Sequence, residues 1–300
     1  MNIGKYDGID RLEFYRKQGI ISNPGRFLDL YEELPDNIEG IIRVIQGLFL
    51  HVFWAGSYGV ELDERQQEDV ESRFIENILE RIMEIDNSSL LESRPYKKRF
   101  FGNCRDHSVF LTSILRHIGI PARARCGFAR YFTPGKFEDH WICEYYDVKK
   151  GRWVGVDPQL DELQKEKLNI GFDTTDLPEG EFLPGGKAWK LVRDGKEDAE
   201  KFGIFDMRGI TFILGDLLRD LAALNKVELL PWDCWGLMMK SEGELLTEDY
   251  ELLDQVVETI EKDSEEIFSI YNNKSLKVPN LVYSYIKGKE EKYKIFDVEK

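Results

Sequence analysis

The fold is decided by three runs of sequence: GNCRDH at residues 102–107, HWICE at 140–144 and WVGVDP at 153–158. Each run contributes one reactive side chain, since Cys104 precedes a helical pattern and His140 and Asp157 accompany two strand patterns. A thiol, an imidazole and a carboxylate carried on separate elements are the parts of an activated thiol nucleophile. The sequence therefore predicts an enzyme whose catalytic residues are Cys104, His140 and Asp157.

Cys104 is expected at the first position of a helix, because Asn103 is a favoured N-cap residue. The exposed N–H groups and partial positive charge of a helix N-terminus favour a thiolate, and thiol pKa values fall from about 8.5 to about 3.5–7.5 in such settings. The same N–H groups can hold an oxyanion, and Gly102 would let a substrate approach the backbone. A buried structural cysteine at a helix start is the alternative interpretation of this residue.

The pattern around these residues predicts an α+β core. Apolar residues recur at helical spacing over 104–118, and Gly119 and Pro121 end the helix. Alternation begins at Ala122, and strands at 141–146 and 152–156 flank a turn at 149–151, which indicates an antiparallel hairpin.

The proposed hairpin gives His140 and Asp157 related positions. His140 opens one strand and Asp157 ends the next, so the carboxylate can orient an imidazole that accepts and returns the thiol proton. As structural alternatives, His140 would be a polar residue at a strand edge and Asp157 a turn residue before Pro158.

The flanking regions are predicted to be mainly helical, with patterns at 38–54 and 64–85 before the core and at 210–224 and 245–270 after it. Residues 161–187 are rich in loop-forming residues. We expect a single domain over 1–300, made of an N-terminal helical region (1–95), a core (96–185) and a C-terminal helical region (186–300).

Composition narrows the possible partners and compartment. A chain of 300 residues with 42% hydrophobic residues can bury a substantial core, and its net charge of −15 argues against nucleic-acid and anionic-membrane partners. The first residues lack the apolar core of a signal peptide, and the four cysteines form no CxxC pair. We therefore expect a cytoplasmic protein with reduced thiols.

A zinc site is the competing interpretation of the cysteines and histidines. Cys104-x-x-His107 and His140-x-x-Cys143 look like two half-sites. However, His140 and Cys143 are three residues apart on a predicted strand and would point to opposite faces. We therefore expect no metal and no other cofactor, with His107 on the helix face near the site.

The motifs resemble the transglutaminase-like superfamily. The matching pattern comprises Gly102-x-Cys104, RHIGIPAR at 116–123, His140-Trp141 and Trp153-x-x-x-Asp157-Pro158. The resemblance implies a papain-like core, in which the helix carrying the cysteine packs on an antiparallel sheet, and it implies thiol acyl transfer. The HVFW run at 51–54, GNCRD at 102–106 and RDLAALNK at 219–226 are similar to those of a bacterial transglutaminase-like group. The chain lacks a D-x-[DN]-x-[DN]-G loop, so the resemblance does not imply calcium dependence.

Several further residues are candidates for substrate binding or for the oxyanion hole: Trp54, Gly102, Asn103, Trp141, Trp232 and Trp235. Trp54 lies upstream of Cys104, and related transglutaminases often use an upstream Trp or Gln to assist the oxyanion hole. A buried aromatic on an apolar helix is the alternative interpretation of Trp54. Trp232 and Trp235 lie in a loop bounded by proline and glycine, which either lines a pocket or packs on the core.

These observations predict a thiol-dependent amide hydrolase or acyl transferase acting on a peptide or small amide-containing substrate. Hydrolysis is favoured, because the sequence marks no amine-binding site. The alternative is a non-enzymatic binding module that keeps the fold and uses a tryptophan-lined cleft. The sequence does not determine the oligomeric state.

Overall fold

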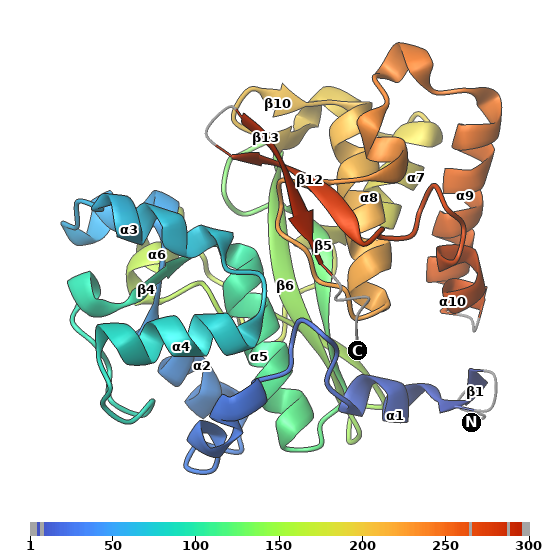
Figure 1. Ribbon diagram of the computed structural model, residues 1–300. Helices are drawn as coiled ribbons and strands as arrows, with labels where there is room; N and C mark the ends of the chain where they lie inside the picture. The colour runs from blue at the N-terminus through green and yellow to red at the C-terminus, as the bar shows by residue number, and fades with distance from the viewer. Residues whose placement is uncertain (1–4, 7–8, 264–265, 287–288, 296–300) are drawn as a thin grey trace. The chain divides into compact units, whose positions relative to one another are not determined.

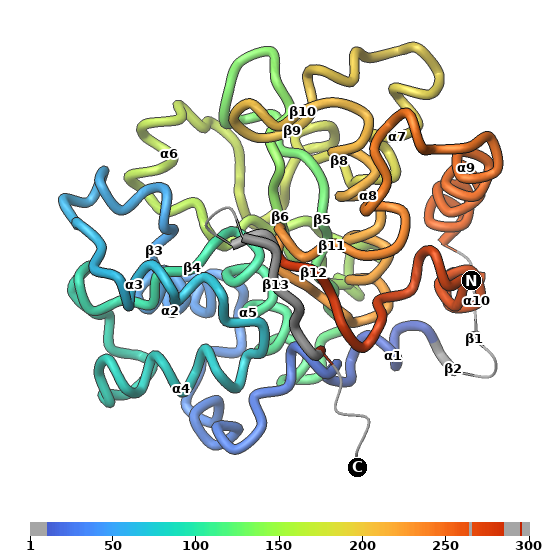
Figure 2. The backbone as a smooth tube through the Cα atoms, turned by 45° about the horizontal axis from the view of Figure 1, so that its top comes forward, coloured from blue at the N-terminus to red at the C-terminus, as the bar shows by residue number. Residues whose placement is uncertain are grey.

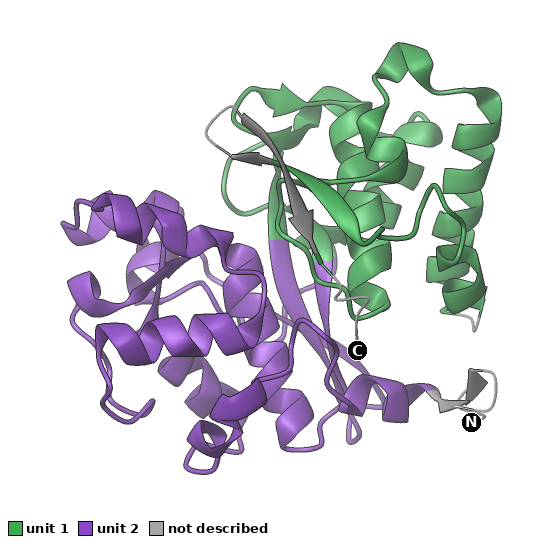
Figure 3. Ribbon diagram, in the orientation of Figure 1, with its two compact units in different colours: residues 1–10, 126–140, 180–300 green, residues 11–125, 141–179 purple. Residues whose placement is uncertain are grey.

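The computed structural model describes residues 5–6, 9–263, 266–286 and 289–295. The chain forms two compact units, which Figure 3 distinguishes by colour. Unit 1 comprises residues 1–10, 126–140 and 180–300, and unit 2 comprises residues 11–125 and 141–179. The division passes through strands β5 (Ala122–Ala129) and β6 (Phe137–Asp147), so each strand contributes residues to both units. The single-domain organisation stays a prediction.

Unit 2 is built around helix α5 (Cys104–His117), the longest helix of this unit among the described residues. Its apolar side chains are fully buried, including Val109, Phe110 and Leu111. Three helices contact α5: α1 (Arg11–Arg16), α2 (Ile38–Leu48) and α4 (Ile75–Ile85) (Figure 1). This packing buries α5 on nearly every side and fixes the position of its first turn.

Strand β7 (Arg152–Val156) completes the predicted hairpin with β6. The two strands are antiparallel and pair Cys143 with Val156, and Gly151 in the turn has a φ of 65°. Helix α5 packs on this strand pair, because Thr112 Oγ1 lies 3.3 Å from the Cys143 sulfur. The α+β class and the packing of the cysteine helix on antiparallel strands are thus confirmed.

The N-terminal helical pattern is more broken than the periodicity predicts. The expected helix at 38–54 ends at Leu48 and continues as strand β3 (Phe49–His51) and the 3-10 helix η2 (Val52–Tyr58). Strand β3 pairs in parallel with β4 (Phe100–Gly102). A short buried strand and a helix are both continuously apolar, so the pattern does not separate them.

Other elements of unit 2 also differ from the prediction. The expected helix at 64–85 divides into α3 (Glu64–Glu68), η3 (Asp69–Glu71) and α4. The predicted loop region contains α6 (Glu162–Leu168), which Asp161 caps by accepting from the Gln164 amide. Unit 2 also contains the 3-10 helices η1 (Gly25–Tyr31) and η4 (Tyr96–Lys98).

Unit 1 combines strands with a helical layer. Its part of β6 lies between β5 and β9 (Phe202–Ile204), and the sheet extends to β8 (Phe182–Pro184) and β10 (Met207–Arg208). Figure 2 shows α7 (Gly185–Arg193), α8 (Ile210–Leu224) and α9 (Thr247–Glu261) beside one another, followed by α10 (Glu266–Tyr271). Helix α8 is confirmed as predicted, whereas 245–270 forms two helices.

Gly185 explains why α7 can lie so close to α8. A Cβ atom at this position would come within 2.6 Å of the Asp216 backbone, so any side chain would push the two helices apart.

A second, three-stranded sheet contains β11 (Asp233–Cys234), β12 (Leu281–Ile286) and β13 (Lys289–Lys294), and β1 (Lys5–Tyr6) pairs with β2 (Ile9–Asp10). Among the described residues, no helix has the length and apolar character needed to cross a membrane.

Candidate active site

Cys104 occupies the first position of α5, as the sequence predicts. Asn103 is the N-cap, and its Oδ1 accepts a hydrogen bond from the Asp106 amide at 3.2 Å. The Asp106 carboxylate in turn accepts from the Asn103 amide at 2.9 Å, which completes a reciprocal capping box. Cys104 is 7% exposed and forms no disulfide. Its backbone therefore belongs to a rigidly held helix terminus, where N–H groups point toward groups outside the helix.

The Asn103 side chain has a spare hydrogen-bond donor beside Cys104. Its Oδ1 is used by the cap, but its Nδ2 is buried and has no hydrogen-bond partner among the described residues. A buried amide N–H without a partner is costly unless another group uses it. This donor belongs to the residue that precedes Cys104 in the chain, and its part in an oxyanion hole stays a prediction.

The cap is reinforced by a buried ion pair. Arg105 Nη1 lies 2.9 Å from Asp106 Oδ1, and both side chains have no exposed surface. Burial raises the pKa of Asp106 to about 6, and the charge of Arg105 opposes that rise. The Asp106 side chain also explains Gly102, because a Cβ there would lie 2.9 Å from Asp106 Oδ2. Close packing of the cap thus requires glycine at 102, apart from any approach of a substrate.

Two histidines lie near this cap in unit 2. His107 Nδ1 lies 2.8 Å from the Asn103 carbonyl oxygen, and His51 pairs with Gly102 across β3 and β4. The two imidazole rings are stacked, with centroids 6.3 Å apart. His107 lies near the helix start, as the sequence predicts, whereas no short sequence pattern marks His51. The parallel β3–β4 pairing, a long-range contact, brings His51 to this segment.

His140 lies in the unit 1 part of β6 and is 2% exposed. Its ring makes edge contacts with two aromatic rings of the preceding loop, Tyr131 at 5.9 Å and Phe132 at 4.9 Å between centroids. These contacts restrict the orientation of the imidazole. His140 is therefore a buried residue in an aromatic setting. Contrary to the prediction, it does not open its strand, because β6 begins three residues earlier at Phe137.

Asp157 lies in unit 2, directly after β7, and has no exposed surface. Its Oδ1 accepts from the Gln159 amide at 3.0 Å, and its own amide donates to the Thr174 carbonyl at 2.9 Å. Asp157 Oδ1 thus accepts the hydrogen bond expected of a turn residue, which was the structural alternative for Asp157. A turn role and a catalytic role are compatible for this residue.

The four tryptophan candidates have different environments. Trp54 lies on η2 and is half-buried, so it is not the buried residue of an apolar helix that we considered. Trp141 is fully buried, and its Nε1 has no hydrogen-bond partner among the described residues. In unit 1, Trp235 is buried and donates to the Leu276 carbonyl at 2.8 Å, which makes it a core residue, while Trp232 is half-buried.

The structure also shows a possible ligand set that the sequence analysis missed. The described residues hold one group of three potential metal ligands close together, Cys126, Asp139 and Asp216, all in unit 1. Among the described residues, no such group contains either half-site considered for zinc, Cys104/His107 or His140/Cys143. The missed residues are far apart in the sequence and lie on three elements, so no short motif indicates them.

Comparison with known proteins identifies the core. Residues 71–158 match the model of the transglutaminase-like superfamily, which confirms the resemblance inferred from the motifs. No curated protein matches the chain. A solved structure similar to it is a candidate cysteine protease from Cytophaga hutchinsonii, at 19% identity and a TM-score of 0.30. That match covers 49% of this chain and 42% of the other, so the chain spans less than half the length of that protein. The core supports a thiol-dependent hydrolase or transferase.

Proposed function

We propose that the protein hydrolyses an amide bond of a peptide or an amino-acid side chain, with Cys104 as nucleophile, His140 as general base and acid, and Asp157 as the group that orients His140. The observation that carries the proposal is the position of Cys104, which is the first residue of a helix whose N-terminus is held by a reciprocal capping box. N–H groups at such a terminus favour negative charge on the sulfur and on an oxyanion. The unpartnered Asn103 Nδ2 adds one donor to these groups.

The reaction proceeds in two stages with the same residues. His140 takes the thiol proton as the Cys104 sulfur bonds to the carbonyl carbon, and the proton passes to the amine as the C–N bond breaks. A water molecule then attacks the thioester, its proton goes to His140, and the C–S bond breaks to give the acid and the thiol. The Cys104 amide and the Asn103 side chain stabilise the oxyanion in both stages.

The environments of His140 and Asp157 support these roles. The aromatic contacts of His140 hold its ring in one orientation, which a general base needs. Asp157 directly follows Val156, the last residue of β7, and the partner of Val156 on β6 is Cys143, three residues after His140.

The test is the release of amine from a panel of peptides and glutamine side-chain amides by the full-length chain. We expect wild type and Cys143→Ala to release product and Cys104→Ala to release none, since Cys143 is a matched buried thiol outside the proposed site. Adding a primary amine separates the two acceptors: an amide product would indicate transamidation, and an acid product hydrolysis. Equal rates for Cys104→Ala and wild type would contradict the thiol mechanism, and ligand binding without turnover would favour the binding-module alternative.

A further inference from the structure

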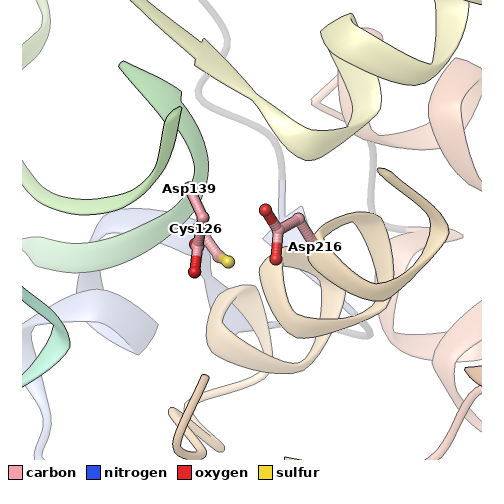
Figure 4. A group of neighbouring side chains, drawn as sticks. All are labelled: Cys126, Asp139 and Asp216. Carbon is pink, nitrogen blue, oxygen red and sulfur yellow. The ribbon is translucent and has the colours of Figure 1, made fainter. Parts of the chain in front are cut away.

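Three potential ligands from three elements of unit 1 meet in one place. Cys126 comes from β5, Asp139 from β6 and Asp216 from α8, and one ligand atom of each lies within 4.8 Å of the others. Figure 4 shows the Cys126 sulfur and the Asp139 carboxylate on the strand side, facing Asp216 on the helix. The cluster uses no residue of the proposed catalytic triad.

Two carboxylate oxygens of the cluster are buried and accept no hydrogen bond from the described residues. Asp216 has no exposed surface, and its Oδ2 is buried with no hydrogen-bond partner among the described residues. Asp139 Oδ1 is likewise buried and has no partner in that part of the chain. Burying a carboxylate without a hydrogen bond or a cation is strongly unfavourable. Both oxygens therefore lie where a positively charged ligand would be favoured.

The neighbouring residues supply only part of the required positive charge. Arg219 Nη1 lies 3.1 Å from Asp216 Oδ1, which leaves Oδ2 directed elsewhere. Asp220 Oδ1 accepts from the Cys126 amide at 3.1 Å and so fixes the backbone that carries the thiol. Burial raises the pKa values of Cys126, Asp139 and Asp216, and the mutual repulsion of the two carboxylates adds to the rise for Asp216.

We propose that Cys126, Asp139 and Asp216 bind a divalent transition-metal ion, for which zinc is the best match. A thiolate with two carboxylates is a donor set that zinc accepts, whereas calcium and magnesium prefer oxygen ligands alone. The two charges of the ion and the Arg219 guanidinium would offset the three negative charges of the ligands, and the Asp220 carboxylate is a further negative charge beside Cys126. Three protein ligands leave a fourth tetrahedral position for water or another small ligand.

The test uses cobalt as a spectroscopic substitute for zinc in the full-length protein after treatment with a chelator. We expect one equivalent of cobalt to produce the near-ultraviolet absorption band of a cobalt–thiolate bond, and zinc to displace it. Cys126→Ser should abolish the band, and Cys143→Ser, which alters a buried thiol outside the cluster, should retain it. Absence of the band in wild type, its persistence in Cys126→Ser or its loss in Cys143→Ser would overturn the proposal.

A second variant covers the case in which Cys126→Ser does not fold. Asp139→Asn conserves side-chain size but removes the charge. We expect it to weaken zinc binding by at least about tenfold, because losing even a residue that only hydrogen-bonds to a metal ligand has an effect of this size. Zinc should raise the Tm of wild type, measured by scanning calorimetry, more than that of the variant. An equal rise in both proteins would contradict the assigned ligands. These readouts do not depend on amide hydrolysis, so they test the metal site separately from the proposed function.

Discussion

The two compact units differ in how they accommodate buried negative charge. In unit 2, Asp106 lies 2.9 Å from Arg105, and Glu144 accepts from Arg123 at 2.7 Å and Arg125 at 3.0 Å. Each of these carboxylates has at least one arginine of its own. The two arginines hold the pKa of Glu144 down at about 2, although burial opposes this effect.

In unit 1 the carboxylates of the cluster outnumber the arginines that pair with them. Asp139 and Asp216 lie together with the Cys126 thiol, and among the described residues Arg219 forms an ion pair with Asp216. Burial raises the pKa values of both carboxyls, that of Asp139 to about 6 as for Asp106 in unit 2, so the units differ in the number of arginines beside each carboxylate and not in this pKa. The difference indicates that the unit 2 charges are complete structural pairs, whereas the unit 1 cluster has capacity for a cation.

Two of the buried cysteines, Cys104 and Cys126, differ in the same way. Cys104 lies at a helix N-terminus, where backbone N–H groups favour negative charge. Cys126 is fully buried beside carboxylates, and burial with their charge raises the pKa of its thiol. The comparison predicts that Cys104 is a nucleophile and that Cys126 ionises only when a metal ion replaces the proton.

The largest expected effect is the loss of the proposed nucleophile. Cys104→Ala should lower kcat/KM for amide hydrolysis by at least about 10⁴-fold, because the proposed thioester forms on the Cys104 sulfur. Cys143→Ala is the control, and steady-state kinetics is the measurement. A variant that keeps more than a tenth of the activity would break the distinction between Cys104 and the other buried thiols.

Asp157→Asn removes a charge but can keep the turn. The asparagine carbonyl oxygen can still accept from the Gln159 amide, which Asp157 Oδ1 does at 3.0 Å. We expect kcat to fall by about 10²- to 10⁴-fold with little change in the Tm. Asp157→Ala should lower both kcat and the Tm. If Asp157→Asn has wild-type kcat, the carboxylate has only the turn role.

The Glu144 pairs give unit 2 a dependence on pH. Because the folded-state pKa of Glu144 is lowered to about 2, its contribution is complete above the ordinary value of about 4.5 and is lost as the pH falls toward 2. The shift corresponds to a contribution on the order of 3 kcal/mol to the free energy of unfolding. Glu144→Gln should therefore be less stable than wild type in urea at neutral pH, and the difference should shrink below about pH 4. A difference independent of pH would show that the arginines do not pair with an ionised Glu144.

The smallest effect concerns the N-cap of α5. Asn103→Ala removes the bond from the Asp106 amide and should reduce the free energy of unfolding by about 1 kcal/mol. Asn103→Ser restores a capping oxygen but has no side-chain amide, so it should recover the stability and still have lowered kcat. Urea unfolding and kinetics together separate the two roles. Full kcat in Asn103→Ser would exclude Asn103 Nδ2 from the oxyanion hole.

The sequence predicted the elements whose signals are local. Helix α5 has an N-cap residue, regular apolar spacing and Gly119 just beyond its end, and the β6–β7 hairpin has alternation and a turn with Gly151. Each of these features is contained within about 20 residues, so pattern alone identifies it.

The remaining features depend on contacts distant in the sequence. Strand β3 continues the apolar pattern of α2 and is distinguished only by its pairing with β4, some 50 residues later. The Cys126, Asp139 and Asp216 cluster requires two adjacent strands and a helix that follows about 75 residues later. Neither periodicity nor a short motif carries this information.

The central claim is that Cys104 is an activated nucleophile, and its alkylation by iodoacetamide as a function of pH tests it most directly. Mass spectrometry of the full-length protein, between about pH 5 and pH 9, follows each cysteine separately, with His140→Ala as the comparison variant. We predict that Cys104 reacts with a midpoint well below about 8.5, that this midpoint rises in His140→Ala, and that Cys126 does not react. A midpoint for Cys104 at or above that of an ordinary thiol, unchanged in His140→Ala, would contradict the account.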